Sequence, residues 1–155
     1  GSGCPHPVLN KDFVGKDASY LASVCGAGNG VKPEILFAET DASHPFVFEE
    51  QMMPVVPIVR VRDVTTGIQE AKKAENNYRH TAIIHSHDVS NMTAMARALD
   101  TTLFIKNGSC MAGLGLGGEG YLSYSIATPT GEGVTNPKTF TRVRRCVMVD
   151  NLRIY

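Results

Sequence analysis

Two adjacent carboxylates, Glu49 and Glu50, stand just before an apolar run and are the residues of this sequence best placed to do chemistry. Pro54 separates them from Val55–Val61, whose composition predicts a buried strand. A carboxylate close to a buried strand is costly unless it is solvated, paired or used in a site. The stretch is therefore the first candidate site, and the rest of the chain has to position it.

Three histidines, His80, His85 and His87, cluster around another predicted strand. His85 and His87 share a face only if that strand continues, and Asp88 is expected to end it by capping a helix. We therefore predict no metal site. Polar or capping roles are the simpler interpretation, and an acid–base role for one histidine stays open.

The cysteines and glycines carry weaker signals. The four cysteines have no CxxC pair or metal-like spacing, which favours free thiols in a reducing cytoplasm (Cys4, Cys25, Cys110 and Cys146). The stretch Gly113–Gly118 matches G-x-G-x-x-G, but no strand directly precedes it and no helix directly follows, so we reject a dinucleotide fingerprint. These glycines are better explained by unusual φ angles or by close approach of the backbone to a ligand.

Charge excludes some functions. The chain has 155 residues with 15 basic and 15 acidic side chains, a balance that argues against a nucleic-acid partner. A small basic group, Arg142, Arg144 and Arg145, is interpreted as the charged face of an edge strand, with a phosphate-like anion site as the alternative. No apolar run approaches the roughly 20 residues of a membrane span, so no membrane partner is expected.

The periodicity predicts an α/β fold. The expected elements are a helix within 12–30 capped by Asp17, a strand at 32–39 buried on both faces around Ile35, Leu36 and Phe37, a strand at 55–61 with Pro57 at an edge or bulge, a helix after Asp63, a strand at 81–85, a helix after Asp88, and a strand at 102–106. Alternation of strands and helices from 55 onward indicates two βαβ units and a mostly parallel sheet with flanking helices.

The C-terminal part breaks this pattern. A glycine-rich loop is expected at 108–120, and two strand-like segments, 121–127 and 139–149, flank a turn at 128–133. The second segment is too polar for a sheet centre. We interpret it as an edge or protruding strand, or half of a hairpin, that pairs with another chain for oligomerisation.

Seven segments together carry a resemblance to a known family: 9–16, 44–54, 79–86, 104–108, 117–121, 129–133 and 144–147. They resemble the CoA-acylating aldehyde dehydrogenases, and more narrowly the acetaldehyde and propionaldehyde dehydrogenases of ethanolamine- and propanediol-utilising bacterial microcompartments. The resemblance runs in order from about Leu9 to the C-terminus.

The resemblance implies an enzyme that oxidises a short aldehyde with NAD and passes the acyl group to coenzyme A, using a cysteine thiolate as nucleophile. Glu50 matches the acid of an E-x-(F/M)-x-P motif that holds the nicotinamide ribose, and Met52 takes the place of the usual aromatic. His80 matches a histidine near the reaction centre. We expect it to act as base or orienter in the CoA step.

Departures from the family pattern define what we expect of this chain. The region that matches the family begins after the NAD-binding domain and after the segment carrying the nucleophilic cysteine. None of the four cysteines occupies that position, and the run Ser109-Cys110-Met111 differs from the family's P-S-Y. Cys110 is best read as a small packing residue.

We therefore expect residues 1–8 to be a linker or cloning remnant, 9–120 the C-terminal part of the catalytic domain, and 121–155 the oligomerisation strands. The expected partners are the N-terminal portion of the same enzyme, further copies of the chain, and a microcompartment shell, with a cytoplasmic location inside a microcompartment. The chain alone is expected to be inactive, with Glu50 exposed to solvent.

Two other interpretations remain open. The first is a non-catalytic assembly module of the same fold that acts through its C-terminal strand. The second is an independent α/β ligand-binding domain that uses the glycine-rich loop. Ligands in open α/β sheets bind beyond the carboxyl ends of the strands, whereas Glu50 and His80 both precede strands. This favours a site shared with another part of the enzyme.

Overall fold

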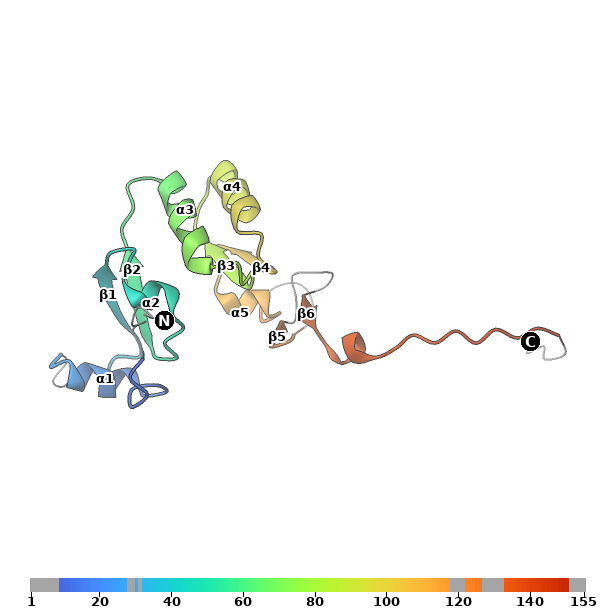
Figure 1. Ribbon diagram of the computed structural model, residues 1–155, viewed down its shortest axis with the longest axis horizontal. Helices are drawn as coiled ribbons and strands as arrows, with labels where there is room; N and C mark the ends of the chain where they lie inside the picture. The colour runs from blue at the N-terminus through green and yellow to red at the C-terminus, as the bar shows by residue number, and fades with distance from the viewer. Residues whose placement is uncertain (1–8, 28–29, 31, 118–121, 127–132, 151–155) are drawn as a thin grey trace, which may run out of the picture. The chain divides into compact units, whose positions relative to one another are not determined.

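The computed structural model describes residues 9–27, 30, 32–117, 122–126 and 133–150 (Figure 1). The chain divides into two compact units. The first contains residues 1–79 and 88–100, and the second contains residues 80–87 and 101–155.

The first unit contains two parallel strands and most of the helices. Its elements are α1 (Ala18–Val24), β1 (Leu36–Thr40), α2 (Pro45–Phe48), β2 (Val55–Val59), α3 (Val64–Glu75) and α4 (Val89–Leu99). β1 and β2 pair in parallel, with Leu36 opposite Val55 and Thr40 opposite Val59. Pro57 is tolerated because, among the described residues, β2 has only β1 as a neighbour, as the sequence predicts for an edge strand.

The second unit holds two further strand pairs. Its elements are β3 (Thr81–Ile84), β4 (Leu103–Lys106), α5 (Cys110–Gly113), β5 (Ser125–Ile126), β6 (Val134–Thr135) and the 3₁₀ helix η1 (Pro137–Phe140). β3 and β4 are parallel, while β5 and β6 are antiparallel. Leu103 and Ile105 of β4 and Ala82 of β3 are buried, so the core of this unit lies at the β3–β4 pair.

The α/β fold with parallel strands and flanking helices is confirmed, but one detail of the expected topology is wrong. The sequence predicts that β2 and β3 share a sheet as parts of successive βαβ units. In the described residues β2 pairs with β1 and β3 with β4, in separate two-stranded sheets. The register of β1 is set from its first residue, where the Leu36 N–H donates to the Pro54 carbonyl at 2.8 Å.

The helix starts follow the sequence closely. The Asp63 carboxylate accepts the Thr66 N–H at 2.7 Å at the start of α3. Asp88 accepts the N–H groups of Ser90 and Asn91 at the start of α4. Asp17 occupies the capping position of α1, but its side chain makes no capping bond. Capping is a local property, which is why it can be read from spacing alone.

The predicted burial of β1 is wrong. Ile35 is 54% exposed and Phe37 is 71% exposed, although both belong to the run that the sequence assigns to a core strand. A strand is buried on both faces only when layers cover it on both sides. Few described residues cover β1, so its apolar side chains stay in contact with solvent.

The predicted strand at 139–149 is also wrong. Pro137–Phe140 forms η1, and residues 141–150 form neither helix nor strand, with every side chain exposed. A strand needs a partner for its backbone groups, and the described residues offer none to this segment. Within the expected loop at 108–120, Cys110–Gly113 instead forms the short helix α5. Most of the expected turn at 128–133 lies outside the described residues.

Candidate functional site

The acid pair follows directly from a one-turn helix, α2. His44 caps this helix, because its ring Nδ1 accepts the Phe46 N–H at 3.1 Å. Glu49 ends it, and its own N–H donates to the Pro45 carbonyl at 2.9 Å. The cap and the proline at the first helical position fix where the helix begins, and with it the direction in which the chain enters Glu49 and Glu50.

The turn that leads into this helix carries a perturbed acid. The hydroxyl and the backbone N–H of Ser43 both donate to the Asp41 carboxylate. These hydrogen bonds favour the ionised form and hold the pKa of Asp41 below its usual value, with the hydroxyl bond the larger cause.

The loop after Glu50 is held at three points. The Gln51 side-chain amide donates to the Phe46 carbonyl. The Met52 carbonyl accepts the Gly15 N–H at 3.0 Å, and the Met53 carbonyl accepts the Val55 N–H at 2.8 Å. Met52 has a φ of +53°, a left-handed conformation that costs a side-chain-bearing residue roughly 1–2 kcal/mol. The loop is therefore fixed in shape by its neighbours.

Within this fixed loop the Glu50 side chain is exposed, as the sequence predicts. Met52 is 68% exposed and shares the loop with Glu50. The two cofactor-binding candidates therefore lie on one short segment that precedes β2 in the sequence, and both are exposed to solvent.

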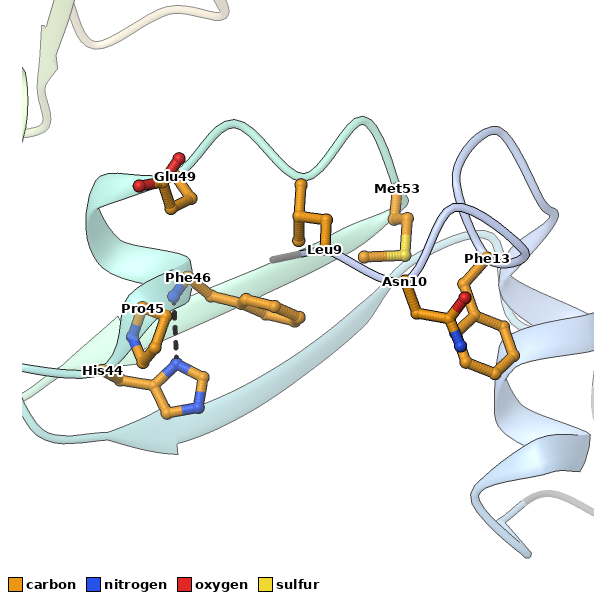
Figure 2. Close-up of a pocket in the computed structure, with 8 residues that line it drawn as sticks. All are labelled: Leu9, Asn10, Phe13, His44, Pro45, Phe46, Glu49 and Met53. Carbon is orange, nitrogen blue, oxygen red and sulfur yellow. Dashed lines mark hydrogen bonds between the residues drawn. The ribbon is translucent and has the colours of Figure 1, made fainter. Parts of the chain in front are cut away.

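A cavity of about 340 Å³ lies beside the acid pair (Figure 2). It is lined by Leu9, Asn10, Phe13, His44, Pro45, Phe46, Glu49 and Met53. Figure 2 shows Leu9, Phe46 and Met53 pointing toward one another, while the Glu49 carboxylate points away from them. Of the two acids, only Glu49 lines this cavity.

A second, almost wholly apolar cavity of about 390 Å³ lies in the same unit. It shares Phe13, Phe46 and Met53 with the first cavity. The α1 helix and the two strands complete it, including the exposed Phe37. Its apolar character marks it as an incompletely filled core rather than a site with polar groups to orient a ligand.

His80 lies in the second unit, one residue before β3, and is exposed. Its carbonyl accepts the Leu103 N–H at 3.0 Å, which ties it to the start of β4. Its ring Nδ1 lies 2.6 Å from the hydroxyl oxygen of Thr81. His80 belongs to the second unit, whereas Glu50 belongs to the first.

The other histidines, the cysteines and the C-terminal arginines are all exposed where the structure describes them. His85 and His87 are exposed, and no three His, Cys, Asp or Glu side chains among the described residues converge as a metal site would require. Cys25, Cys110 and Cys146 are free and exposed, while Cys4 lies outside the described residues. The arginines at 142, 144 and 145 are exposed on the irregular C-terminal segment.

The glycine-rich stretch has a structural explanation. Gly115 and Gly117 have φ values of +99° and +73°, which confirms the prediction of unusual backbone angles. At Gly113, an added Cβ would lie 3.0 Å from Ile105, because α5 packs tightly on β4. Gly118 and Gly120 lie outside the described residues.

Sequence reasoning missed Asn107. Its side-chain oxygen accepts the Ser86 N–H and its side-chain amide donates to the Ser86 carbonyl, both at 2.8 Å. Its φ of +54° places it in the left-handed region that asparagine tolerates. The Asn-Gly pair directly after β4 is the signal that could have found it.

No helix that the structure describes is long and apolar enough to cross a lipid bilayer. No protein-family model matches the chain.

Curated relatives and solved structures do match. The acetylating acetaldehyde dehydrogenase of Escherichia coli K12 is 51% identical over 147 residues, which is 95% of this chain and 32% of that protein. The CoA-propanoylating propanal dehydrogenase of Salmonella typhimurium is 44% identical over 97% of this chain and 32% of its own length. The chain therefore spans about a third of the length of these relatives.

Among solved structures, Rhodopseudomonas palustris propionaldehyde dehydrogenase with bound CoA and an acylated cysteine matches with a TM-score of 0.81 and 48% identity, over 91% of this chain and 34% of that one. An engineered glycolyl-CoA reductase with bound NADP⁺ matches with a TM-score of 0.81 and 47% identity, over 91% of this chain and 33% of that one. A propionaldehyde dehydrogenase from the fucose-utilisation microcompartment of Clostridium phytofermentans matches with a TM-score of 0.81 and 41% identity, over 93% of this chain and 33% of that one.

Proposed function

We propose that this chain forms part of a CoA-acylating aldehyde dehydrogenase. Nearly all of the chain matches about one third of the length of each such enzyme, and we propose that it has the role of that third. The reaction is the oxidation of a short aldehyde to an acyl-CoA, with a nicotinamide dinucleotide as oxidant. The observation that carries the proposal is 44–51% identity to enzymes named for this activity.

The complete reaction has two stages, which are oxidation of the aldehyde on a cysteine and transfer of the acyl group to CoA. A cysteine thiolate adds to the aldehyde carbon, and the nicotinamide accepts hydride from that carbon, which leaves a thioester on the cysteine. The CoA thiol then gives up its proton to a base, its sulfur attacks the thioester carbon, and the cysteine thiolate leaves. In our proposal His80 is that base or orients it, and the nucleophilic cysteine is supplied from outside the 155 residues.

Glu50 suits the cofactor by the chemistry of its side chain. A carboxylate can accept hydrogen bonds from both hydroxyls of a ribose, and this one projects from a loop that is held by hydrogen bonds to Gly15, Phe46 and Val55. Exposure of Glu50 supports a shared site, in which the opposite wall comes from the rest of the enzyme. Met52, on the same loop, would then cover one side of the nicotinamide ribose.

Three partners follow from this function. We propose that residues 9–120 dock with the remainder of the enzyme, and that residues 121–155 form strands with a second copy. The exposed Val143 and Val147, at 87% and 80%, support the latter role. The microcompartment origin of one structural relative supports packaging inside a bacterial microcompartment, where a shell protein would be the further partner.

A chimaera tests the function. The matched third of the E. coli acetaldehyde dehydrogenase is replaced by this chain, and acyl-CoA formation from acetaldehyde and propanal is measured. We expect activity within about tenfold of the parent, since the replacement is 51% identical. A stable chimaera that binds CoA but forms no acyl-CoA would contradict the proposal.

Two companion measurements separate the alternatives. The 155 residues alone are expected to reduce no NAD⁺ with aldehyde and CoA. In the chimaera, His80→Ala should slow acyl-CoA formation by roughly 10²-fold or more, the usual contribution of an acid–base group. If the isolated chain instead self-associates and the chimaera is inactive, the assembly-module interpretation gains the advantage.

A further inference from the structure

We propose that His44 and Gln51 are positioning residues for Glu50. The His44 ring holds the backbone N–H of Phe46, the Gln51 side chain holds the Phe46 carbonyl, and together they fix the turn from which Glu50 projects. The inference rests on the proposed function in one respect, since it takes Glu50 as the acid that binds the nicotinamide ribose. The two contacts do not depend on that function, and they can be measured separately.

Donor and acceptor are fixed in both contacts. A backbone N–H can only donate, so the His44 Nδ1, 3.1 Å from the Phe46 nitrogen, is the acceptor (Figure 2). A backbone carbonyl can only accept, so the Gln51 side chain donates to Phe46 through its amide nitrogen. The neutral His44 ring that makes this bond therefore carries its proton on Nε2.

His44 is itself held at the start of α2. Its N–H donates to the Asp41 carbonyl at 3.3 Å, and its carbonyl accepts the Val47 N–H at 2.9 Å. Its ring packs edge-on against the Phe46 ring, with the ring centres 5.2 Å apart and the planes at 89°. These contacts keep the ring where its Nδ1 meets the Phe46 N–H.

Gln51 replaces a helical hydrogen bond. In a longer helix the Phe46 carbonyl would accept the N–H of Glu50, four residues further along. The helix α2 ends at Phe48, and Glu49 has extended backbone, with φ −102° and ψ 135°. The Gln51 amide supplies a donor to the Phe46 carbonyl instead. Its side chain is half-buried, so loss of this bond would leave the amide partly shielded from water, at a cost in stability.

Glu50 lies between two anchored residues. Before it, the Glu49 N–H donates to the Pro45 carbonyl at 2.9 Å, and after it, Gln51 reaches Phe46. Both acceptors lie in the first turn of α2, so Glu50 keeps a constant position relative to that turn. A loop that is already ordered binds a ligand more tightly than one that must first be ordered. We therefore expect both contacts to strengthen binding of the dinucleotide.

A proton on the His44 Nδ1 would remove the cap, because an imidazolium has no lone pair to accept the Phe46 N–H. The titratable groups near the ring are the carboxylates of Asp41, which precedes α2, and of Glu49, which lines the same cavity as the ring. The other residues that line this cavity do not titrate. The contact therefore predicts weaker dinucleotide binding as the pH falls from about 8 to about 5, where histidine side chains ordinarily take up a proton.

Backbone ¹⁵N relaxation on the complete 155-residue chain tests the contacts. The wild-type Glu50 amide should be rigid, with an order parameter of about 0.85. The value should fall below about 0.6 in His44→Phe, which keeps a flat ring but cannot accept, and in Gln51→Met, which keeps the length but cannot donate. His44→Asn should stay rigid, since asparagine is a good cap. A flexible Glu50 in the wild type, or a His44→Asn as flexible as His44→Phe, would overturn the proposal.

Gln69→Met is the matched control. It makes the same exchange of an amide for a thioether in the same unit, at an exposed position on α3. The Gln69 side chain makes no hydrogen bond within the described residues, so Glu50 should stay rigid in this variant. A loss of order equal to that in Gln51→Met would assign the effect to general loosening and overturn the proposal.

The chimaera gives the functional readout. The dissociation constant of the dinucleotide should rise about fivefold in His44→Phe and in Gln51→Met, the size of effect that loss of a helix cap brings, and His44→Asn should restore it to within about twofold of the parent. Binding of CoA should stay within about twofold throughout, which reports an intact fold. From about pH 8 to about pH 5, dinucleotide binding should weaken several-fold more in the parent than in His44→Asn. Equal pH profiles would overturn the role of the His44 ring.

A double-mutant cycle shows whether these residues act through Glu50. With Glu50→Gln already present, Gln51→Met should weaken dinucleotide binding by no more than about twofold further. Effects that multiply in the double variant would show that Gln51 acts independently of Glu50, and the proposal would be wrong. If Glu50→Gln alone binds the dinucleotide as the parent does, the assignment of Glu50 to the ribose fails. The positioning role then falls with it, even where the relaxation data confirm the two contacts.

Discussion

Asn107 binds Ser86 through both ends of its side-chain amide, at 2.8 Å each, across 21 residues of sequence. The two bonds copy a backbone pairing and extend the β3–β4 ladder by one step at the carboxyl ends of its strands. The backbone N–H of Asn107 adds a third bond, to the Ile84 carbonyl at 2.8 Å. One side chain thus holds the segment between His85 and His87 in place.

Substitution of Asn107 should open this segment. We expect Asn107→Ala to lower the free energy of unfolding by about 2–3 kcal/mol, because two hydrogen bonds are lost and alanine tolerates left-handed backbone less well than asparagine. Asn77→Ala is the control. Asn77 also has left-handed backbone, at φ +62°, and its side chain makes no hydrogen bond within the described residues. It should cost only the backbone part, about 1 kcal/mol. Denaturant unfolding measures both, and equal effects would show that the amide bonds contribute nothing.

Acid should destabilise α3 through its cap. The backbone N–H of Thr66 donates to the Asp63 carboxylate, and this bond is the first cause that holds the pKa of Asp63 below its usual value of 3.8. A lowered folded-state pKa means that the stabilisation is present above 3.8 and is lost as the pH falls through the lower folded value. Thermal unfolding between pH 5 and about pH 2 should therefore show a steeper fall in Tm for the wild type than for Asp63→Asn. Asparagine keeps a capping oxygen but does not titrate, so parallel curves would contradict the assignment.

Phe37 should matter only when the rest of the enzyme is present. It is 71% exposed, so Phe37→Ser should change the stability of the isolated chain by no more than about 0.5 kcal/mol. In the chimaera, where we propose that the remaining two thirds cover β1, the same change should cost about 3 kcal/mol. Phe37→Leu is the control and should cost roughly 1 kcal/mol there. Equal small effects in both proteins would mean that this side chain stays in solvent in the enzyme.

Features that depend on neighbouring residues in the sequence could be predicted, whereas features that depend on distant segments could not. Asp63 and Asp88 were found as caps because a cap acts on N–H groups two or three residues away. The burial of Phe37 could not be found, because burial depends on which segment covers the strand. Strand pairing has the same difficulty, and a strong apolar pattern at 55–61 does not say whether β1 or β3 will be its neighbour. Residues 141–150 failed as a strand for the same reason, since no described partner is available.

The site shows the same division. Exposure of Glu50 was foreseen because the family resemblance makes it one wall of a cofactor site that is shared with the rest of the enzyme. The bond from Gly15 to Met52, which fixes the loop, could not be foreseen, since it joins backbone groups 37 positions apart. The Thr81–His80 contact was missed for a different reason. The sequence predicts that the strand begins at Thr81 and places His80 before it, but it does not tell which way the His80 ring turns.

Glu50 and Glu49 provide the sharpest test of the cofactor site, because they are adjacent yet differently placed. Glu49 lines the cavity of Figure 2 and Glu50 does not. In the chimaera, Glu50→Gln should raise KM for the nicotinamide dinucleotide about tenfold, which corresponds to the loss of roughly 1.4 kcal/mol of charged hydrogen bonding to the ribose. KM for CoA should stay unchanged. Glu49→Gln, with the same loss of charge one residue away, should leave both constants within about twofold. If Glu49→Gln raises KM for the dinucleotide and Glu50→Gln does not, the ribose-binding acid is Glu49, and the assignment of Glu50 to the cofactor is wrong.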